Sequence, residues 1–330
     1  MPAALRHTTL RQLQTFLAAA ELGSFGRAAQ ALHLTQPAVS MQMSQLSQAL
    51  GVALFERRGR RLALTQAGET LMPYVERLTE TLKEAGEALD ALQGLRRGRL
   101  RIALVTTTRY FAPRLAALFR EAHAHIDMEV SIAHRDAVIA QLESNHADLA
   151  IMGRPPAHLP IVAEPFAQHP HGVIAPPWHP LAGKRRIAPA RAADQPFIAR
   201  EPGCGTRDAM DRYFAGCGIA PAIVQTMPSN ESIKQAVMAG MGLAFISLHT
   251  VSLEHQGGHL ALLDLQGLPV LRDWFVIHRA NKPLSPAAEA FKTFVHAQAP
   301  AFMKTLLPRA GGKPPPAPEG AAARRPARRA

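Results

Sequence analysis

The sequence predicts a multidomain protein: an all-α winged helix-turn-helix, then a long coiled-coil linker helix, then an α/β domain of two subdomains. Three observations lead to this prediction. Apolar residues recur at helical spacing through residues 9–50. A heptad pattern of leucines follows between residues 66 and 95. Strand and helix patterns then alternate over most of the remaining chain, which is typical of an α/β domain.

The net charge of the chain gathers at its two ends. The 330 residues carry a formal charge of +12, and their apolar fraction of 47% is enough to build more than one core. Residues 1–66 hold seven arginines against Glu21 and Glu56, and residues 308–330 hold six basic residues against Glu319. The long middle part is therefore close to neutral. A small basic domain indicates a polyanion as its partner.

Several function classes lack their signatures in this sequence. The longest apolar runs stay below 18 residues, and the first residues lack the pattern of a signal peptide, so we expect no membrane partner and a cytoplasmic location. Cys204 and Cys217 are too few for a disulfide framework. We find no HExxH, GxSxG, Walker A or Rossmann glycine pattern, so we expect no catalytic residue, metal or cofactor. The histidines of His169-Pro170-His171 and His179 are interpreted as surface loop residues.

The first three predicted helices have clear ends. Residues 9–21 form the first helix, and Gly23 stops it. Ser24 caps the second helix and Thr35 the third, where Pro37 is tolerated because the first helical turn has unpaired N–H groups. The third helix stops at Gly51, and residues 55–64 form a β-hairpin with an arginine-rich tip.

The exposed face of the third helix carries short hydroxyl and amide side chains. In a helix-turn-helix, the second helix of the motif enters the major groove, where Gln can bond an adenine edge. The hairpin arginines would contact the DNA backbone or minor groove. The expected DNA-binding residues are Thr35, Gln36, Pro37, Ser40, Gln42 and Ser44 on the helix, and Arg57, Arg58 and Arg60 in the hairpin. The alternative is a small helical domain with a solvated polar face and a basic loop.

The linker helix has the pattern of a two-helix coiled coil. Its apolar positions recur at spacings of four and three: Leu71, Val75, Leu78, Leu82, Ala85, Leu89 and Leu92. Pro73 conflicts with a helix interior, so we expect the heptads to start properly just beyond it. The basic cluster at 96–99 closes the helix.

The α/β part is expected to contain parallel sheets with helices on their faces. Strands are predicted around 100–104, 126–132, 148–152, 173–174, 197–198, 223–226 and 243–246, with helices around 111–119, 138–142, 206–215 and 231–239. The predicted domains are 1–66, the linker 67–97, the α/β domain 98–307 and a disordered basic tail 308–330. Within the α/β domain, we assign 98–168 plus 270–307 to subdomain I and 169–269 to subdomain II.

The stretch from Leu10 to Gly68 resembles the DNA-binding domain of LysR-type transcriptional regulators. The resemblance rests above all on ELGSFGRAAQALHLTQPAVSMQMSQLSQALGVALFERRGRRLALTQAG. It implies an effector domain similar in architecture to periplasmic binding proteins, dimers through the linker helix, tetramers through the effector domains, and an inverted-repeat operator in double-stranded DNA. RNA polymerase is a further partner that it implies. The sequence departs from the family at Ser44 and Ser47, where Lys and Glu are common.

Three effector-domain motifs resemble the carbon-fixation members, which activate operons for RuBisCO and other Calvin-cycle enzymes. The motifs are 105–111 (VTTTRYF), 150–156 (AIMGRPP) and 200–207 (REPGCGTR). Ligands of open α/β sheets bind at the carboxyl ends of strands, and helix N-termini bind anions. We therefore expect a phosphorylated sugar or organic acid as a small-molecule effector. The expected contacts are Thr106, Thr107, Thr108, Arg109, Arg154, Cys204, Thr206 and Arg207.

Each of these assignments has an alternative. The threonines could cap the following helix, and Arg154 and Arg207 could form structural ion pairs. Cys204 and Cys217 could act in redox sensing, as cysteines do in peroxide-sensing members of the family. The whole chain could instead control another metabolic operon in response to a different organic anion. A solute-binding protein would need an export signal, and an enzyme would need a catalytic constellation. The basic tail could add nonspecific DNA affinity or be a solvated appendage.

Overall fold

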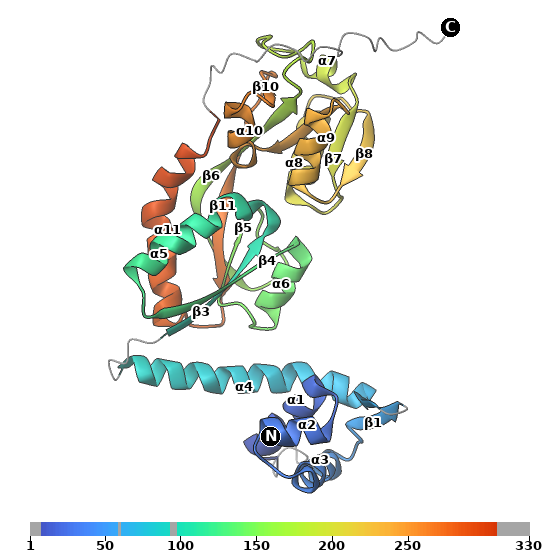
Figure 1. Cartoon of the computed structure of the whole chain (residues 1–330), viewed down its shortest axis with the longest axis vertical. Helices are drawn as coiled ribbons and strands as arrows, with labels where there is room; N and C mark the ends of the chain where they lie inside the picture. Colours follow the sequence, from blue (N-terminus) through green and yellow to red (C-terminus); the bar gives the residue numbers. More distant parts are fainter. Residues whose placement is uncertain (1–7, 59–60, 93–97, 309–330) are drawn as a thin grey trace. The chain divides into compact units, whose positions relative to one another are not determined.

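The computed structural model describes residues 8–58, 61–92 and 98–308 (Figure 1). The chain forms two compact units. The first holds the residues up to Gly98 together with Ser144–His146, and the second holds the remainder. The predicted disordered tail, from residue 309 onward, lies outside the described residues and stays a prediction, as do the domain boundaries.

The first unit opens with the three predicted helices, α1 (Leu10–Leu22), α2 (Phe25–Ala31) and α3 (Gln36–Leu50). Their predicted caps are confirmed. The side chains of Ser24 and Thr35 accept hydrogen bonds from the first turns of α2 and α3. Gly23 and Gly51 end α1 and α3 with φ of 59° and 71°, a left-handed conformation that glycine adopts without strain.

A β-hairpin follows α3, as predicted. Strand β1 (Phe55–Arg58) pairs antiparallel with β2 (Arg61–Leu64). The Phe55 ring packs against the rings of Phe16 and Phe25, with centroids 5.4 and 5.3 Å away, so the hairpin is fixed to the helical core. Close packing continues at Gly68, where a Cβ atom would lie 2.3 Å from the Leu54 carbonyl oxygen.

The linker helix α4 (Gln66–Leu92) is continuous across Pro73. Its apolar positions divide into two groups. Leu71 and Val75 pack into the core of the first unit, beside Phe16 and Leu46. From Leu78 to Leu89 the stripe is exposed, with relative exposures of 45% at Leu78, 47% at Leu82 and 60% at Leu89. The stripe that is left without a partner in one chain thus begins beyond Pro73.

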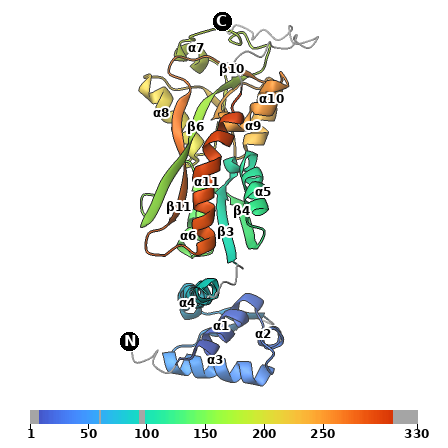
Figure 2. The same cartoon turned by 90° about the vertical axis from the view of Figure 1, so that its left-hand side faces the viewer.

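One mixed sheet runs through the whole second unit. Its strands, in the order β4-β3-β5-β11-β6-β9-β7-β8 with β10 beside β6, are β3 (Gly98–Val105), β4 (Ile126–Ala133), β5 (Leu149–Met152), β6 (Ile161–Ala175), β7 (Phe197–Arg200), β8 (Ile223–Met227), β9 (Leu243–Ser247), β10 (Ala261–Leu263) and β11 (Val270–Arg279). The long strands β6 and β11 connect its two halves, as Figures 1 and 2 show.

The expectation of parallel sheets holds for only part of the pairing. Strand β3 pairs parallel with β5, and β7 pairs parallel with β8 and β9. However, β11 runs antiparallel to β5 and β6, and β6 runs antiparallel to β9. Parallel neighbours need a long crossover connection, usually a helix, whereas antiparallel neighbours do not. Strand β6 carries the chain from the first half of the sheet into the second and β11 carries it back, so these two neighbours run in opposite directions.

Helices cover both faces of each half. They are α5 (Ala112–Ala122), α6 (Arg135–Glu143), α7 (Pro189–Ala193), α8 (Gly205–Gly216), α9 (Asn230–Met238), α10 (Ser252–Gln256) and α11 (Pro286–Thr305), with 3₁₀ turns η2 (Thr106–Tyr110) and η3 (Leu248–Thr250). Helices α5 and α11 bury Phe119 and Phe291 against the β3–β5 half. Helix α8 buries Phe214 against the β7–β9 half. None of the helices in the described part of the chain is long and apolar enough to cross a bilayer.

Candidate functional site

The outer face of α3 collects most of the expected DNA contacts. Thr35, Gln36, Pro37, Ser40 and Ser44 are all exposed. Gln36, Ser40 and Ser44 follow one another at four-residue spacing and so lie on one face. Gln42 differs, because its Oε1 accepts a hydrogen bond from the Thr15 hydroxyl at 2.7 Å and so joins α3 to α1.

One exposed apolar residue of α3 was not anticipated. Met41 is 57% exposed and neighbours Ser40, at the edge of the same polar face. It offers an apolar contact of the kind that reads thymine methyl groups. In the hairpin, Arg57 is exposed. Arg60 lies outside the described residues, as does the Arg58 side chain, so both stay predictions.

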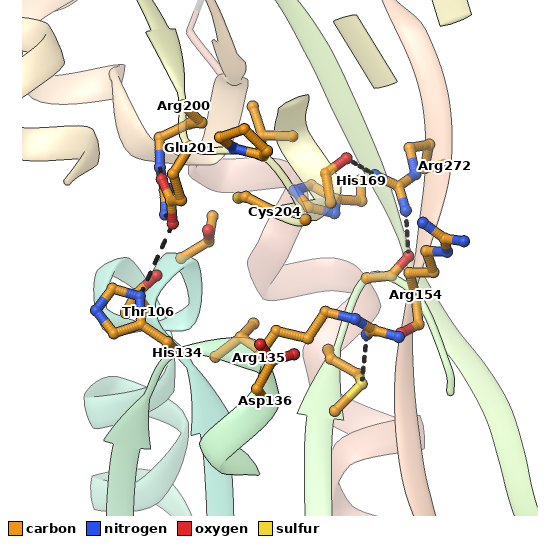
Figure 3. Close-up of a pocket in the computed structure, with 18 of the residues that line it drawn as sticks. Thr106, His134, Arg135, Asp136, Arg154, His169, Arg200, Glu201, Cys204 and Arg272 are labelled. Atoms are coloured by element: carbon orange, nitrogen blue, oxygen red, sulfur yellow. Dashed lines mark hydrogen bonds and ion pairs between the residues drawn. The ribbon is translucent and has the colours of Figure 1, made fainter. Parts of the chain in front are cut away.

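The second unit contains a cavity of about 280 Å³ between its two halves. It lies beyond the ends of β3, β5 and β7, with β6 and β11 behind it (Figure 3). Five of the expected effector contacts line it: Thr106, Thr107, Arg154, Cys204 and Thr206. The sequence motifs at 105–111, 150–156 and 200–207 therefore meet at one place, as the strand-end rule predicts.

The other three expected contacts do not line this cavity. Thr108 is fully buried, and its hydroxyl donates to the Val105 carbonyl at 2.8 Å within the 3₁₀ turn η2. Arg109 donates to the Thr106 carbonyl and lines a smaller neighbouring cavity. Arg207 forms an ion pair with Asp211 at 3.0 Å. Arg154 lines the main cavity but also forms an ion pair with Asp208. In this structure Arg154 and Arg207 therefore both form ion pairs, which was the alternative to ligand contact.

Three cavity arginines were missed: Arg135, Arg200 and Arg272. Arg200 is neutralised, since its guanidinium bonds both Glu201 oxygens at 2.7 and 2.8 Å. The other two donate to neutral acceptors within the described structure. Arg272 bonds the carbonyls of Gly205 at 2.5 Å and Gly153 at 2.8 Å. Arg135 bonds the Arg154 carbonyl and the Met152 sulfur.

The environment of these two arginines favours an anion. Burial lowers the pKa of both Arg135 and Arg272, which means that their charges are poorly compensated. The N-terminus of α8 adds to the positive potential. Cys204 occupies its N-cap position without a side-chain hydrogen bond, leaving the first N–H groups of α8 beside the cavity. The site can therefore bind a phosphate or carboxylate in bidentate fashion.

Sequence signals existed for some of the missed arginines. Arg200 opens the motif at 200–207, and Arg135 follows the end of a predicted strand. Both satisfy the strand-end rule that selected the threonines. Arg272 had no such signal, because β11 was not predicted as an element.

The two cysteines lie at opposite ends of α8, with Cys204 at the N-cap and Cys217 at the C-cap. A helix of 12 residues is about 18 Å long. Cysteine Cα atoms more than about 7 Å apart cannot form a disulfide without backbone movement. In this fold, the two thiols cannot form a disulfide with each other.

The interpretation of His169 and His171 as surface loop residues was wrong. Both lie on the central strand β6, with relative exposures of 4% and 0%. Neighbouring layers cover both faces of this strand, which the short apolar run at 173–174 did not reveal. His179 is half-buried in a turn. Burial, reinforced by Arg272, lowers the pKa of His171 to about 3, and burial lowers the pKa of His249 to about 4. Among the described residues, no cluster of His, Cys, Asp and Glu could hold a metal ion.

Two family profiles match the chain in succession. Residues 10–69 match the bacterial regulatory helix-turn-helix protein of the lysR family, and residues 93–300 match the LysR substrate binding domain. The chain belongs to the LysR family. The resemblance seen in the sequence and the predicted fold class are thereby confirmed, and the chain is a DNA-binding transcriptional regulator.

Relatives of this LysR-type regulator include carbon-fixation regulators. It is 46% identical to the RuBisCO operon transcriptional regulator of Allochromatium vinosum, over 89% of this chain and 97% of that protein. The regulatory domain of Synechocystis PCC6803 CcmR in complex with 2-PG is 35% identical, with a TM-score of 0.59 over 61% of this chain and 97% of that one. Full-length CbnR complexed with target DNA shares the fold at 23% identity, with a TM-score of 0.65 over 88% of this chain and 99% of that chain.

Proposed function

We propose that this LysR-type regulator activates a carbon-fixation operon in the cytoplasm in response to a phosphorylated organic acid. The similarity to the RuBisCO operon regulator along 97% of its length supports the operon class. The cavity supports the ligand class, since Arg135, Arg272 and the α8 N-terminus face a space large enough for a small anion. The related CcmR domain, which was solved with 2-PG (2-phosphoglycolate), supplies a probe.

DNA recognition is assigned to α3 and the hairpin. Helix α3 would lie in the major groove, with Gln36 bonding an adenine edge and Ser40 and Ser44 contacting neighbouring bases or phosphates. Arg57, Arg58 and Arg60 would bind the DNA backbone. Two copies of α3, brought together by a dimer, would read an inverted repeat in successive major grooves.

Dimerisation is assigned to the exposed stripe of α4. Leu78, Leu82 and Leu89 are large apolar residues at heptad spacing, and each is exposed in one chain. A second copy of α4 would remove these side chains from water. Effector domains would join two such dimers into a tetramer.

Leu82→Glu should break this assembly, because it places a carboxylate in an apolar seam. We expect the tetramer to dissociate to species no larger than dimers, measured by sedimentation velocity. Thr81→Glu is the matched control, since it adds the same charge at an exposed neighbouring position of α4 and should leave the tetramer intact. A tetramer that persists with Leu82→Glu would contradict the assignment.

The effector would act by shifting populations. An anion that bonds Arg135 and the α8 N-terminus connects the two halves of the second unit, and would favour the arrangement in which both are close. A change between these halves would alter the spacing of DNA-binding pairs in the tetramer, the bend of the DNA and its contact with RNA polymerase. Footprinting of a RuBisCO-operon promoter with and without 2-phosphoglycolate tests the proposal. An identical protected region and bend angle would contradict it.

Arg135→Gln should weaken 2-phosphoglycolate binding about tenfold or more, because it removes a partly buried positive charge at the cavity. Arg109→Gln removes a nearby arginine that does not line this cavity, and should bind like the wild type. Titration calorimetry on the full chain compares them. Equal affinities of the two variants would refute the role of Arg135.

A further inference from the structure

His169 has a buried nitrogen without a partner at the wall of the cavity. The ring stacks on Trp274, with centroids 3.8 Å apart and an interplanar angle of 17°. Its Nε2 lies 2.9 Å from the Ser247 hydroxyl. Its Nδ1 is buried and has no hydrogen-bond partner in the described structure. A buried polar atom without a partner is unfavourable, so a ligand that bonded to Nδ1 would gain affinity from it.

Gly153 lies closely against this nitrogen. A Cβ atom at this position would lie 2.8 Å from His169 Nδ1, so any other residue type would displace the ring or the Gly153 backbone. The Gly153 carbonyl is held by Arg272, one of the two arginines that donate only to neutral acceptors here. Gly153 and His169 both line the cavity. Gly153 therefore contacts both His169 Nδ1, which has no partner, and the guanidinium of Arg272.

The His169 ring is neutral, so it has one hydrogen-bond donor and one acceptor. Burial lowers the pKa of His169 well below its usual value, and the positive charge of Arg272 acts in the same direction. A neutral imidazole has one N–H and one acceptor nitrogen. When the Ser247 hydroxyl donates to Nε2, Nδ1 carries the proton and becomes a donor. His169, held by Ser247, then provides an uncharged N–H donor in the cavity that Arg135 and Arg272 also line.

The cavity is larger than a phosphate group needs. Its volume of about 280 Å³ has space for several water molecules. In Figure 3, His169 and Cys204 lie on one side of the cavity and Arg135 on the other. A ligand that reaches both sides must carry a second oxygen group at some distance from its phosphate.

We propose that His169, positioned by Ser247 and Trp274, donates its Nδ1 proton to this second oxygen group and so selects phosphorylated acids over inorganic phosphate. The inference rests on the proposed function, because it requires an anionic effector in this cavity. It assigns specificity to a neutral histidine and leaves the charge recognition to the arginines.

Two substitutions at His169 separate its nitrogens. Asn places an amide near the position of Nδ1, whereas Gln places it near Nε2, against Ser247. Titration calorimetry of the full chain with 2-phosphoglycolate should show affinity within threefold of the wild type for His169→Asn and at least tenfold weaker for His169→Gln. Inorganic phosphate, used as a competitor, should bind both variants within threefold of the wild type. His259→Gln, at an exposed histidine outside the cavity, is the matched control.

Gly153→Ala gives an independent test if a His169 variant fails to fold. The added methyl group displaces the ring or the Gly153 backbone at Nδ1, so 2-phosphoglycolate should bind at least tenfold more weakly while inorganic phosphate is unaffected. Tryptophan fluorescence melting checks that each variant is folded. Wild-type affinity in His169→Gln, or an equal loss for both ligands, would overturn the inference. A wild-type chain that binds no 2-phosphoglycolate would overturn the proposed effector, and this inference with it.

Discussion

A Ser40→Glu variant is expected to lose operator binding, with affinity about a hundredfold weaker than that of the wild type. Ser40 is exposed at the centre of the α3 face that carries Gln36 and Ser44. A carboxylate there would face DNA phosphates and base edges, and a dimer carries the change twice. Fluorescence anisotropy with a labelled promoter fragment at fixed salt measures the effect.

The control for Ser40→Glu is Gln14→Glu, which adds the same charge at an exposed position of α1. Its operator affinity should stay within threefold of the wild type, because α1 lies outside the recognition face. Circular dichroism should show that both variants keep their helices. If the two variants bind DNA equally well, α3 is not the recognition helix.

The helical part of the first unit could be predicted from the sequence because its signals are local. Thr35, Pro37 and Gly51 mark the ends of α3 within the segment itself, and Val39, Met43 and Leu46 give its buried face. A cap or an apolar stripe depends on residues a few positions apart, so one sequence is enough to find it. The stripe of α4 was visible for the same reason.

The centre of the second unit could not be predicted in this way. Strands β6 and β11 pair with each other over most of their length, although about a hundred residues separate them in the chain. Such pairing depends on the whole sheet and leaves no local period. Part of the candidate site was missed for this reason, because His169 lies on β6 and Arg272 lies on β11. Motifs at strand ends identified Thr106 and Cys204, but the groups contributed by the crossing strands had to be found in the structure.

The buried histidines on and beside these strands make the second unit sensitive to acid. His169, His171 and His249 are neutral in the folded state, and burial holds the pKa of each below its usual value of about 6.5. Between pH 6.5 and about 4, the unfolded chain therefore binds more protons than the folded chain. Stability is complete above pH 6.5 and is lost as the pH falls below it, by about 1.4 kcal/mol per pH unit for each histidine.

The three histidines together should lower the free energy of unfolding by about 4 kcal/mol per pH unit. Over two pH units this loss approaches the whole stability of a domain. Urea unfolding followed by tryptophan fluorescence measures this unit selectively, because Trp178 and Trp274 are the two tryptophans of the chain. The midpoint should fall steeply from pH 6.5 to pH 5. Asp148 and Glu201, whose pKa values are lowered by Arg101 and Arg200 against the effect of burial, lose their contribution only at lower pH, so this window isolates the histidines.

Replacing one histidine identifies the source of the acid sensitivity. His249→Asn keeps an acceptor for the Trp274 indole N–H, which lies 3.4 Å from His249 Nδ1, but it cannot be protonated. It should therefore remove about a third of the pH dependence between pH 6.5 and 5. His259→Gln, at an exposed site, should leave the slope unchanged. A midpoint that stays constant over this window in the wild type would mean that the three imidazoles are reached by water and already charged in the folded state.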